Sequence, residues 1–285
     1  KFLMTILVTG SSGFIGSNLI EFFKKKKIKF IGIDKIKNPY LKHSSLIKLN
    51  LLNKKALETV IIKKKIKYII HLAAIPGFVS CHNNPDKAFK NNIEATFNLI
   101  LAAQKGKVKN ILIASSMGVD NFEKNPSIYG LTKLVCEKIS KTFVNVHKSN
   151  IKTLKISNVF GPYSMHKSSV IHSFIKKILS KKKILIHKSG RQERDFVFVG
   201  DVCKKLLKEI YKKDTKQEIV INTNKFLRVL DIKNLLQKIS QKKIEYSYIA
   251  TPKGYDDKIY SKPIMKINNN FMKNLELTYN WYKSF

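Results

Sequence analysis

A glycine triplet near the start of the chain constrains the fold more than any other feature. Gly10, Gly13 and Gly16 directly follow the apolar run Met4–Thr9 and open the apolar-periodic stretch Phe14–Lys25. A short apolar run bounded by glycine is typical of a buried strand, and apolar residues that recur every three to four positions are typical of a helix. The sequence therefore predicts a strand, a tight glycine turn and a helix packed close to the strand.

This turn has the properties of a phosphate-binding site. Gly10 permits the sharp turn, Gly13 lets the backbone approach a pyrophosphate, and Gly16 lets the helix approach the strand. The helix N-terminus adds free N–H groups and the positive end of the helix dipole. Asp34 follows the next predicted strand, Lys29–Ile33. An acid there accepts hydrogen bonds from a ribose 2′-hydroxyl and repels a 2′-phosphate, so we expect NAD and not NADP. The alternative is an ordinary structural turn.

Short apolar runs alternate with longer helical patterns through the first half of the chain. Further strands are predicted at Tyr68–Leu72, Asn110–Ser115 and Lys152–Ile156, and further helices at Ala56–Lys64, Pro85–Lys105 and Tyr129–His147. This rhythm is typical of a parallel sheet with helices on both faces. We therefore expect an α/β fold with a Rossmann-type doubly wound parallel sheet.

The rhythm loosens after about residue 160. Helices are predicted at Val170–Leu179, Leu206–Tyr211 and Val229–Ile239, and short strands at Ile184–His187 and Phe196–Val199. We expect a NAD-binding Rossmann domain over residues 1–160. Residues 161–285 are expected to form mainly a smaller substrate-binding lobe, with some elements returning to the Rossmann sheet.

Three residues form a candidate reactive set. Tyr129 and Lys133 lie four residues apart at the start of a predicted helix, so their side chains share a face. Positive charge from Lys133 and from a cationic nicotinamide would lower the pKa of the phenol, which could then exchange a proton with a substrate hydroxyl. Ser116 ends a predicted strand and could bond the same oxygen. A Tyr-x-x-x-Lys pair alone is commonly structural, but its place after the glycine motif favours a reactive site.

These motifs resemble the extended short-chain dehydrogenase/reductase family, and within it the NAD-dependent nucleotide-sugar epimerase/dehydratase group. The resemblance runs from about Thr5 to Val202 and continues more faintly to the C-terminus. The matching segments are residues 8–16, 71–74, 92–96, 114–116, 127–133, 158–162 and 190–199.

The resemblance implies roles for individual residues. Ser116, Tyr129 and Lys133 look like the catalytic set, and Ser116, Asn158 and Arg194 look like substrate ligands. The guanidinium fork of Arg194 suits a diphosphate, although an ion pair with Glu193 or Asp195 is an alternative. Cofactor contacts are implied for Gly10, Ser12, Gly13, Phe14, Ile15, Gly16, Asp34, Asn50, Leu51, Leu72, Ala73, Ala74, Asn92, Ser115, Tyr129, Lys133, Ile156 and Val159.

The sequence departs from the group at several points. Asn50 stands where the group usually has an acid, and Thr251–Gly254 stands where many members carry an arginine. Met117 and Gly118 follow Ser116 where dehydratases carry an Asp-Glu pair, which argues against a 4,6-dehydratase.

The resemblance implies epimerisation, most simply at C4 of a UDP- or dTDP-sugar, by transient oxidation to a keto-sugar. The alternatives are a nucleotide-sugar ketoreductase or dehydrogenase with an exchanging cofactor, and a non-catalytic Rossmann protein that binds nucleotide or polyanion. The resemblance also implies a homodimer formed through the helices at Pro85–Lys105 and Tyr129–His147, and a role in polysaccharide biosynthesis.

Composition bounds the partners. Lys and Arg number 55 against 19 Asp and Glu, a formal net charge of +36. Because the lysines are spread along the chain, we interpret the charge as compositional, with nonspecific nucleic-acid binding expected at low salt. Cys81, Cys136 and Cys203 form no CxxC pair, and the histidines show no ligand spacing. We therefore expect no metal site, and we expect the protein to reside in a reducing cytoplasm. No run approaches the roughly 20 apolar residues of a membrane span.

Overall fold

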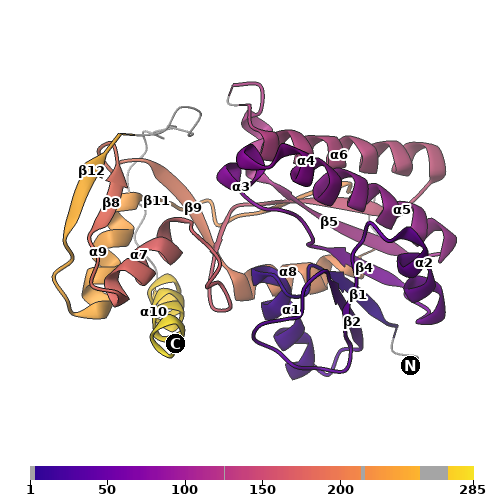
Figure 1. The fold of residues 1–285 in the computed structure, drawn as a ribbon, viewed down its shortest axis with the longest axis horizontal. Coiled ribbons are helices and arrows are strands. Elements are labelled where there is room, and N and C mark those ends of the chain that lie inside the picture. The colour runs from indigo at the N-terminus through magenta and orange to yellow at the C-terminus, as the bar shows by residue number, and fades with distance from the viewer. Residues whose placement is uncertain (1–3, 125, 213–215, 251–268) are drawn as a thin grey trace. The chain divides into compact units, whose positions relative to one another are not determined.

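The computed structural model describes residues 4–124, 126–212, 216–250 and 269–285 (Figure 1). The chain divides into two compact units. The first contains Lys1–Ile156 and Val202–Ile221, and the second contains Ser157–Asp201 and Asn222–Phe285. The segment 202–221 thus returns to the first unit after the chain has entered the second.

The first unit is built on a seven-stranded sheet. Its strands are β1 Ile6–Thr9, β2 Phe30–Asp34, β3 Leu46–Lys48, β4 Tyr68–His71, β5 Asn110–Ser116, β6 Ile151–Ile156 and β10 Glu218–Ile221. Their order in space is β10-β6-β5-β4-β1-β2-β3, and every pairing is parallel. The prediction of a Rossmann-type parallel sheet is confirmed.

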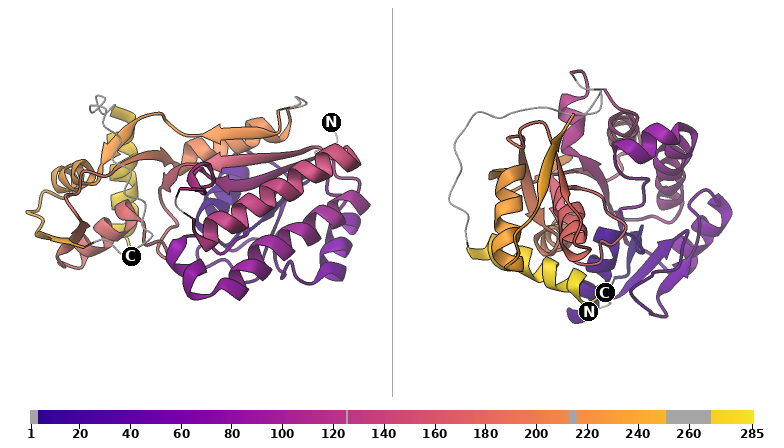
Figure 2. Two further views of the ribbon diagram at one scale, coloured as in Figure 1. Left: turned by 90° about the horizontal axis from the view of Figure 1, so that it is seen from above. Right: turned by 60° about the vertical axis from the view of Figure 1, so that its left-hand side comes forward.

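Helices cover both faces of this sheet (Figure 1). They are α1 Phe14–Lys25, α2 Lys54–Lys63, α3 Phe78–Asn83, α4 Pro85–Ala88, α5 Ala95–Lys105, α6 Ile128–His147 and α8 Val199–Ile210. Helices α1 and α8 lie on one face, and α2, α5 and α6 lie on the other, with α5 and α6 side by side (Figure 2). None of the helices among the described residues is long and apolar enough to cross a membrane.

The sheet is buried on both faces, and most residues of its central strands β1 and β4 are apolar. All four residues of β1 and of β4 are buried. Leu7, Ile69 and Ile111 contribute to one core cluster with side chains from α2 and α5. Burying one such aliphatic side chain contributes roughly 1.5–3 kcal/mol, so these strands form the rigid base from which the loops at their carboxyl ends project.

The long helix predicted at Pro85–Lys105 is interrupted. A π-helical turn, η1 Phe89–Glu94, separates α4 from α5. Such insertions are frequent at functional sites, and this one contains the buried Asn92. The strand predicted at Phe196–Val199 is β9 Glu193–Phe198, and the helix predicted from Leu206 already begins at Val199.

The described residues of the second unit form two small sheets and three helices. Its strands are β7 Asn158–Phe160, β8 Ile184–His187, β9, β11 Phe226–Arg228 and β12 Tyr246–Ile249, and its helices are α7 Val170–Leu179, α9 Val229–Ser240 and α10 Asn269–Lys283. The strands pair in the orders β11-β9-β7 and β12-β8. A separate core that includes Phe160, Phe174, Leu236 and Leu275 holds these elements together.

Candidate active site

The glycine turn has no room for side chains. Gly10 has a φ of 70°, and a Cβ built on it would lie 2.6 Å from the backbone nitrogen of Ala73. A Cβ on Gly16 would lie 2.0 Å from the carbonyl oxygen of Gly10. Glycine at these two positions therefore lets β1, α1 and the end of β4 approach one another, as the motif predicted.

Asp34 is fixed against this turn. Its Oδ2 accepts a hydrogen bond from the Ser12 backbone N–H at 3.0 Å, and its Oδ1 accepts one from the Ile36 backbone N–H at 3.2 Å. Each carboxylate oxygen can accept a further bond, so the hydroxyls of a ribose can still donate to Asp34. The carboxylate thus lies beside the turn in the arrangement that a nicotinamide adenine dinucleotide requires.

The predicted cofactor residues come together in one pocket of the first unit. Eight of them line it: Gly10, Gly13, Asp34, Asn50, Leu51, Leu72, Ala73 and Ala74. Lys35 and Asn91 also line this pocket, and the Lys35 ammonium donates to Asn91 Oδ1 at 2.9 Å. The sequence analysis missed this pair, because nothing in the local pattern of either residue connects the end of β2 with η1.

The other predicted cofactor residues do not line this pocket and lie on several elements, among them Gly16 on α1 and Tyr129 and Lys133 on α6. Ser12, Phe14 and Ile15 form the turn and the start of α1, Asn92 lies in η1, Ser115 ends β5, and Ile156 ends β6. Val159 lies on β7 of the second unit. The residues of the first unit fit NAD by three observations: glycines at which a Cβ would clash with neighbouring backbone, a helix N-terminus without a side-chain cap, and an acid at the end of β2.

The three predicted catalytic residues come from the end of β5 and the first turns of α6. Lys133 Nζ lies 6.0 Å from the centroid of the Tyr129 ring and donates to the Ala114 carbonyl at 2.8 Å. The Ser116 hydroxyl accepts from the Gly118 backbone N–H at 3.2 Å and forms a side-chain hydrogen bond with Tyr129. The structure therefore brings a phenol, a hydroxyl and an ammonium together within the first unit.

The chain's own residues do not lower the pKa of Tyr129. Burial is the largest effect and raises the pKa to about 12, and the hydrogen bond with Ser116 offsets this only in part. Burial also lowers the pKa of Lys133. The predicted lowering of the phenol pKa required Lys133 together with a cationic nicotinamide, so it stays a prediction for the protein with its cofactor bound. The nicotinamide would have to supply the rest of the positive charge.

A chain of buried polar side chains lies beneath the site. The Thr9 hydroxyl bonds His71 Nδ1 at 2.6 Å, and His71 Nε2 bonds the Thr96 hydroxyl at 2.8 Å. Burial, followed by the charge of Lys133, lowers the pKa of His71 to about 3. His71 is therefore neutral, and it connects the end of β1 to α5.

Asn92 connects this region to the catalytic helix. Its Oδ1 accepts from the Ile75 backbone N–H at 2.7 Å, and its Nδ2 donates to the Ile75 carbonyl and to the Thr132 hydroxyl, at 3.1 and 3.0 Å. Thr132 in turn donates to the Tyr129 carbonyl at 2.9 Å. Asn92 thus positions both the loop after Ala74 and the turn that carries Tyr129. A role was predicted for Asn92 but not for Thr9, Thr96 or Thr132, although each threonine lies within one of the matching segments.

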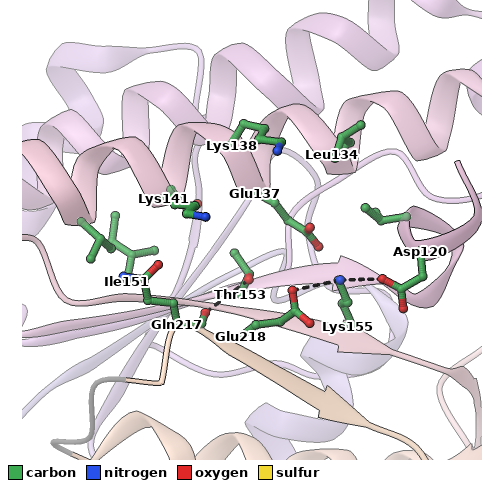
Figure 3. A pocket seen from close by; sticks show the side chains of 13 residues that line it. Asp120, Leu134, Glu137, Lys138, Lys141, Ile151, Thr153, Lys155, Gln217 and Glu218 are labelled. Carbon is green, nitrogen blue, oxygen red and sulfur yellow. Dashed lines mark hydrogen bonds and ion pairs between the residues drawn. The ribbon is translucent and has the colours of Figure 1, made fainter. Parts of the chain in front are cut away.

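Glu137 lies one turn beyond Lys133 on the same face of α6. The Ser115 hydroxyl donates to Glu137 Oε1 at 2.5 Å, and burial raises the pKa of this carboxyl. Glu137 also faces a separate pocket of about 400 Å³ over β6 and β10 (Figure 3). There the Lys155 ammonium pairs with Asp120 and Glu218, at 2.5 and 2.9 Å. Burial alone would lower the pKa of Lys155. The hydrogen bonds with the carboxylates of Asp120 and Glu218 have the larger effect and raise it.

The two predicted ligands of a substrate diphosphate lie in the second unit. Asn158, on β7, donates to the Asp195 carbonyl at 3.1 Å, and Arg194, on β9, donates to the Glu193 carbonyl at 2.9 Å. The Asp195 carboxylate accepts from the backbone N–H and the hydroxyl of Thr223. The segment Thr251–Gly254 lies outside the described residues.

The structure offers no cluster of metal ligands. Among the residues that it describes, no group of three or more His, Cys, Asp or Glu could hold a metal ion. Cys81, Cys136 and Cys203 are buried and are not joined by disulfide bonds.

The chain belongs to the NAD dependent epimerase/dehydratase family, whose model matches residues 6–223. The predicted family is therefore confirmed, and with it the dependence on NAD. The chain is 31% identical to the uncharacterised UDP-glucose epimerase YtcB of Bacillus subtilis, over 91% of this chain and 87% of that one. It is 30% identical to the UDP-glucuronate 4-epimerase of Thermodesulfobacterium geofontis, over 70% and 69%.

Solved structures support the fold over nearly the whole chain. The UDP-N-acetylglucosamine 4-epimerase of Methanobrevibacter ruminantium is similar with a TM-score of 0.86 and 25% identity, over 99% of this chain and 98% of that one. The UDP-glucuronic acid 4-epimerase of Bacillus cereus, in complex with UDP-glucuronic acid and NAD, is similar with a TM-score of 0.83 and 25% identity, over 99% of both chains.

Proposed function

We propose that the protein is a NAD-dependent 4-epimerase of a UDP-sugar. One observation carries the proposal: the side chains of Ser116, Tyr129 and Lys133 are assembled in the same unit as a pocket lined by the glycine turn and Asp34. Relatives that match most of the chain's length are named as UDP-sugar 4-epimerases. A reactive set beside a dinucleotide pocket is what reversible oxidation of a sugar hydroxyl requires.

Bound NAD supplies the acceptor and later the donor of a hydride at the sugar carbon. Tyr129 takes the proton of the C4 hydroxyl and gives it back after the keto-sugar has turned over in the site. Ser116 bonds the same oxygen, and Lys133 holds a positive charge beside the phenol. Burial raises the pKa of Tyr129, which suits the step in which the phenol returns its proton to the sugar. A phenol with a raised pKa donates only when the sugar oxygen gains negative charge.

We propose the second unit as the substrate lobe. Arg194 and Asn158 are the residues that would hold the diphosphate, since a guanidinium fork matches phosphate oxygens. The site gives no support to dehydration at C5 and C6, because Met117 and Gly118 follow Ser116 and supply no acid-base pair.

We further propose a homodimer that forms through α5 and α6. Phe97 on α5 and Leu131 on α6 are exposed by 41 and 42%. Large exposed apolar side chains on neighbouring helices are typical of an interface. Light scattering of the purified protein tests this: a dimer that Leu131→Glu converts to a monomer supports it, and a monomeric native protein refutes it.

We place the enzyme in the cytoplasm, in line with its three cysteines that are not joined by disulfide bonds, as a supplier of activated sugar for polysaccharide biosynthesis. The test of its function is the nucleotide released when the purified protein is denatured, identified by mass spectrometry. Stoichiometric NAD supports an epimerase that retains its cofactor between half-reactions. A protein that arrives empty and binds NADPH more tightly than NADH would contradict it and would favour an exchanging ketoreductase.

A further inference from the structure

The loops that lead into four strands meet at one edge of the sheet of the first unit. Because all strands are parallel in the order β6-β5-β4-β1-β2, the residues before them lie side by side. Backbone bonds connect them: Ile6 N–H donates to the Lys29 carbonyl at 3.2 Å, and Lys109 N–H donates to the Lys67 carbonyl at 2.8 Å. This is the amino-terminal edge of the sheet, opposite the carboxyl ends that carry the cofactor pocket (Figure 1).

Lysine dominates these loops. The exposed lysines are Lys24, Lys25, Lys26, Lys27, Lys29, Lys63, Lys64, Lys65, Lys105, Lys107, Lys109 and Lys148, and we call this set the lysine edge. Residues 24–29, 63–67, 105–109 and 147–150 contain no Asp or Glu. The lysines are spread along the sequence, but the parallel sheet brings these four runs together at the amino-terminal ends of its strands.

Four lysines of this edge hold a backbone conformation that favours glycine. Lys27, Lys65, Lys107 and Lys148 have φ values of 54, 50, 50 and 53°. Each lies within two residues after a helix and shortly before a strand. Glycine commonly ends a helix in this conformation because it has no Cβ. In each of the four connections, a lysine therefore stands at the position where glycine would give the least backbone strain.

We propose that the lysine edge binds the surface of an anionic lipid membrane. Two exposed side chains near these lysines are aliphatic: Ile62 and Val146 are exposed by 53 and 66%. Basic residues can bind the anionic headgroups of a membrane, and neighbouring apolar side chains can enter the acyl-chain region below them. The four loops contain no Phe, Tyr, Trp or Arg, the residues on which bases stack and which read nucleic acid, so a membrane fits better than RNA or DNA.

This orientation leaves the cofactor pocket accessible. The pocket lies at the opposite end of the strands, so a membrane at the lysine edge faces away from it. Each lysine near an anionic surface strengthens binding by roughly fivefold, a factor that follows from about 1 kcal/mol per residue. Loss of four lysines would therefore weaken binding by at least about 100-fold.

The test uses flotation of the full-length protein with vesicles at physiological ionic strength. One set of vesicles contains phosphatidylserine in phosphatidylcholine, and the other contains phosphatidylcholine alone. The edge variant combines Lys27→Gly, Lys65→Gly, Lys107→Gly and Lys148→Gly, which removes four charges and relieves four positive-φ side chains. Its melting temperature should therefore not fall, and the same positions changed to Asn provide a second variant. The matched control is Lys87→Gln, Lys90→Gln, Lys138→Gln and Lys141→Gln, which removes four exposed charges from other surfaces of the same unit.

We expect binding to the phosphatidylserine vesicles alone, a loss of about 100-fold or more in the edge variant, and a much smaller loss in the control. Equal losses in both variants would overturn the proposal, because net charge and not the lysine edge would then drive binding. Absence of binding to phosphatidylserine vesicles would also overturn it. Tighter binding to single-stranded RNA than to vesicles at the same salt would reassign the edge to nucleic acid.

Discussion

Replacing His71 by leucine tests the buried polar chain beneath the site. The change has two opposing effects on the free energy of unfolding: it removes hydrogen bonds, and it removes a group that destabilises the folded protein at low pH. The imidazole is 3% exposed and bonds the hydroxyls of Thr9 and Thr96, at 2.6 and 2.8 Å. Leucine has a similar volume but makes neither bond. Thr96 still donates to the Asn92 carbonyl, and Thr9 still accepts from the Ala73 N–H. The loss at pH 7 should therefore be about 2 kcal/mol, near the middle of the range for buried groups that lose one partner.

The same change removes a titrating group. The folded-state pKa of His71 is about 3, against 6.5 for an unperturbed histidine. Between these values the unfolded chain binds a proton that the folded chain does not, so this contribution to stability is fully present above pH 6.5 and is lost as the pH falls. The loss is about 1.4 kcal/mol per pH unit. At pH 5 the native protein has therefore lost about 2 kcal/mol of stability through His71. The variant His71→Leu has no such loss, because leucine does not titrate.

Urea unfolding at pH 7 and at pH 5 measures both effects. We expect the variant to be less stable at pH 7 and nearly as stable as the native protein at pH 5. His147→Leu, at an exposed position, is the control and should follow the native protein at both values. If the stabilities of native protein and His71→Leu fall in parallel between pH 7 and pH 5, His71 is not a buried neutral histidine and the reasoning fails.

Three further predictions concern the cofactor and the chemistry. Tyr129→Phe should lower kcat by about 10²- to 10⁴-fold while NAD content stays stoichiometric, and full activity would remove the phenol from the mechanism. Asp34→Ser should raise the affinity for NADP relative to NAD by about tenfold, because the repulsion of a 2′-phosphate is lost; fluorescence titration with both dinucleotides measures this, and an unchanged ratio would contradict it. Gly10→Ala should abolish NAD binding, since its Cβ would lie 2.6 Å from Ala73 N; a soluble variant that retains NAD would refute the close approach.

The parts of the site that follow from local patterns could be predicted from the sequence. The glycine turn, Asp34 and the Tyr129–Lys133 pair are separated by fixed numbers of residues on one strand or helix, so their geometry is built into the spacing. The parallel sheet followed from the alternation of apolar runs and helical patterns. The family resemblance added Asn50 and Ala74, which line the same pocket.

Features that depend on contacts between distant segments could not be predicted. The bonds from Thr9 to His71 and from Asn92 to Thr132 join residues that are 62 and 40 positions apart. The pKa of Tyr129 depends on how deeply the phenol is buried, which the sequence does not encode locally. The edge strands β3 and β10 are only three and four residues long, too short for their sequences to show a clear period. The lysine edge exists only because a parallel sheet brings four loops together.

The most direct test of the proposed function is an NMR time course of UDP-glucose, UDP-glucuronic acid and UDP-N-acetylglucosamine, each incubated with the purified protein and no added nucleotide. The account predicts that one of these sugars converts to a mixture of its C4 epimers, with no net change in NADH absorbance, and that Tyr129→Phe does not convert it. Net accumulation of a keto-sugar or an oxidised sugar, or turnover only when NADPH is supplied, would contradict the epimerase.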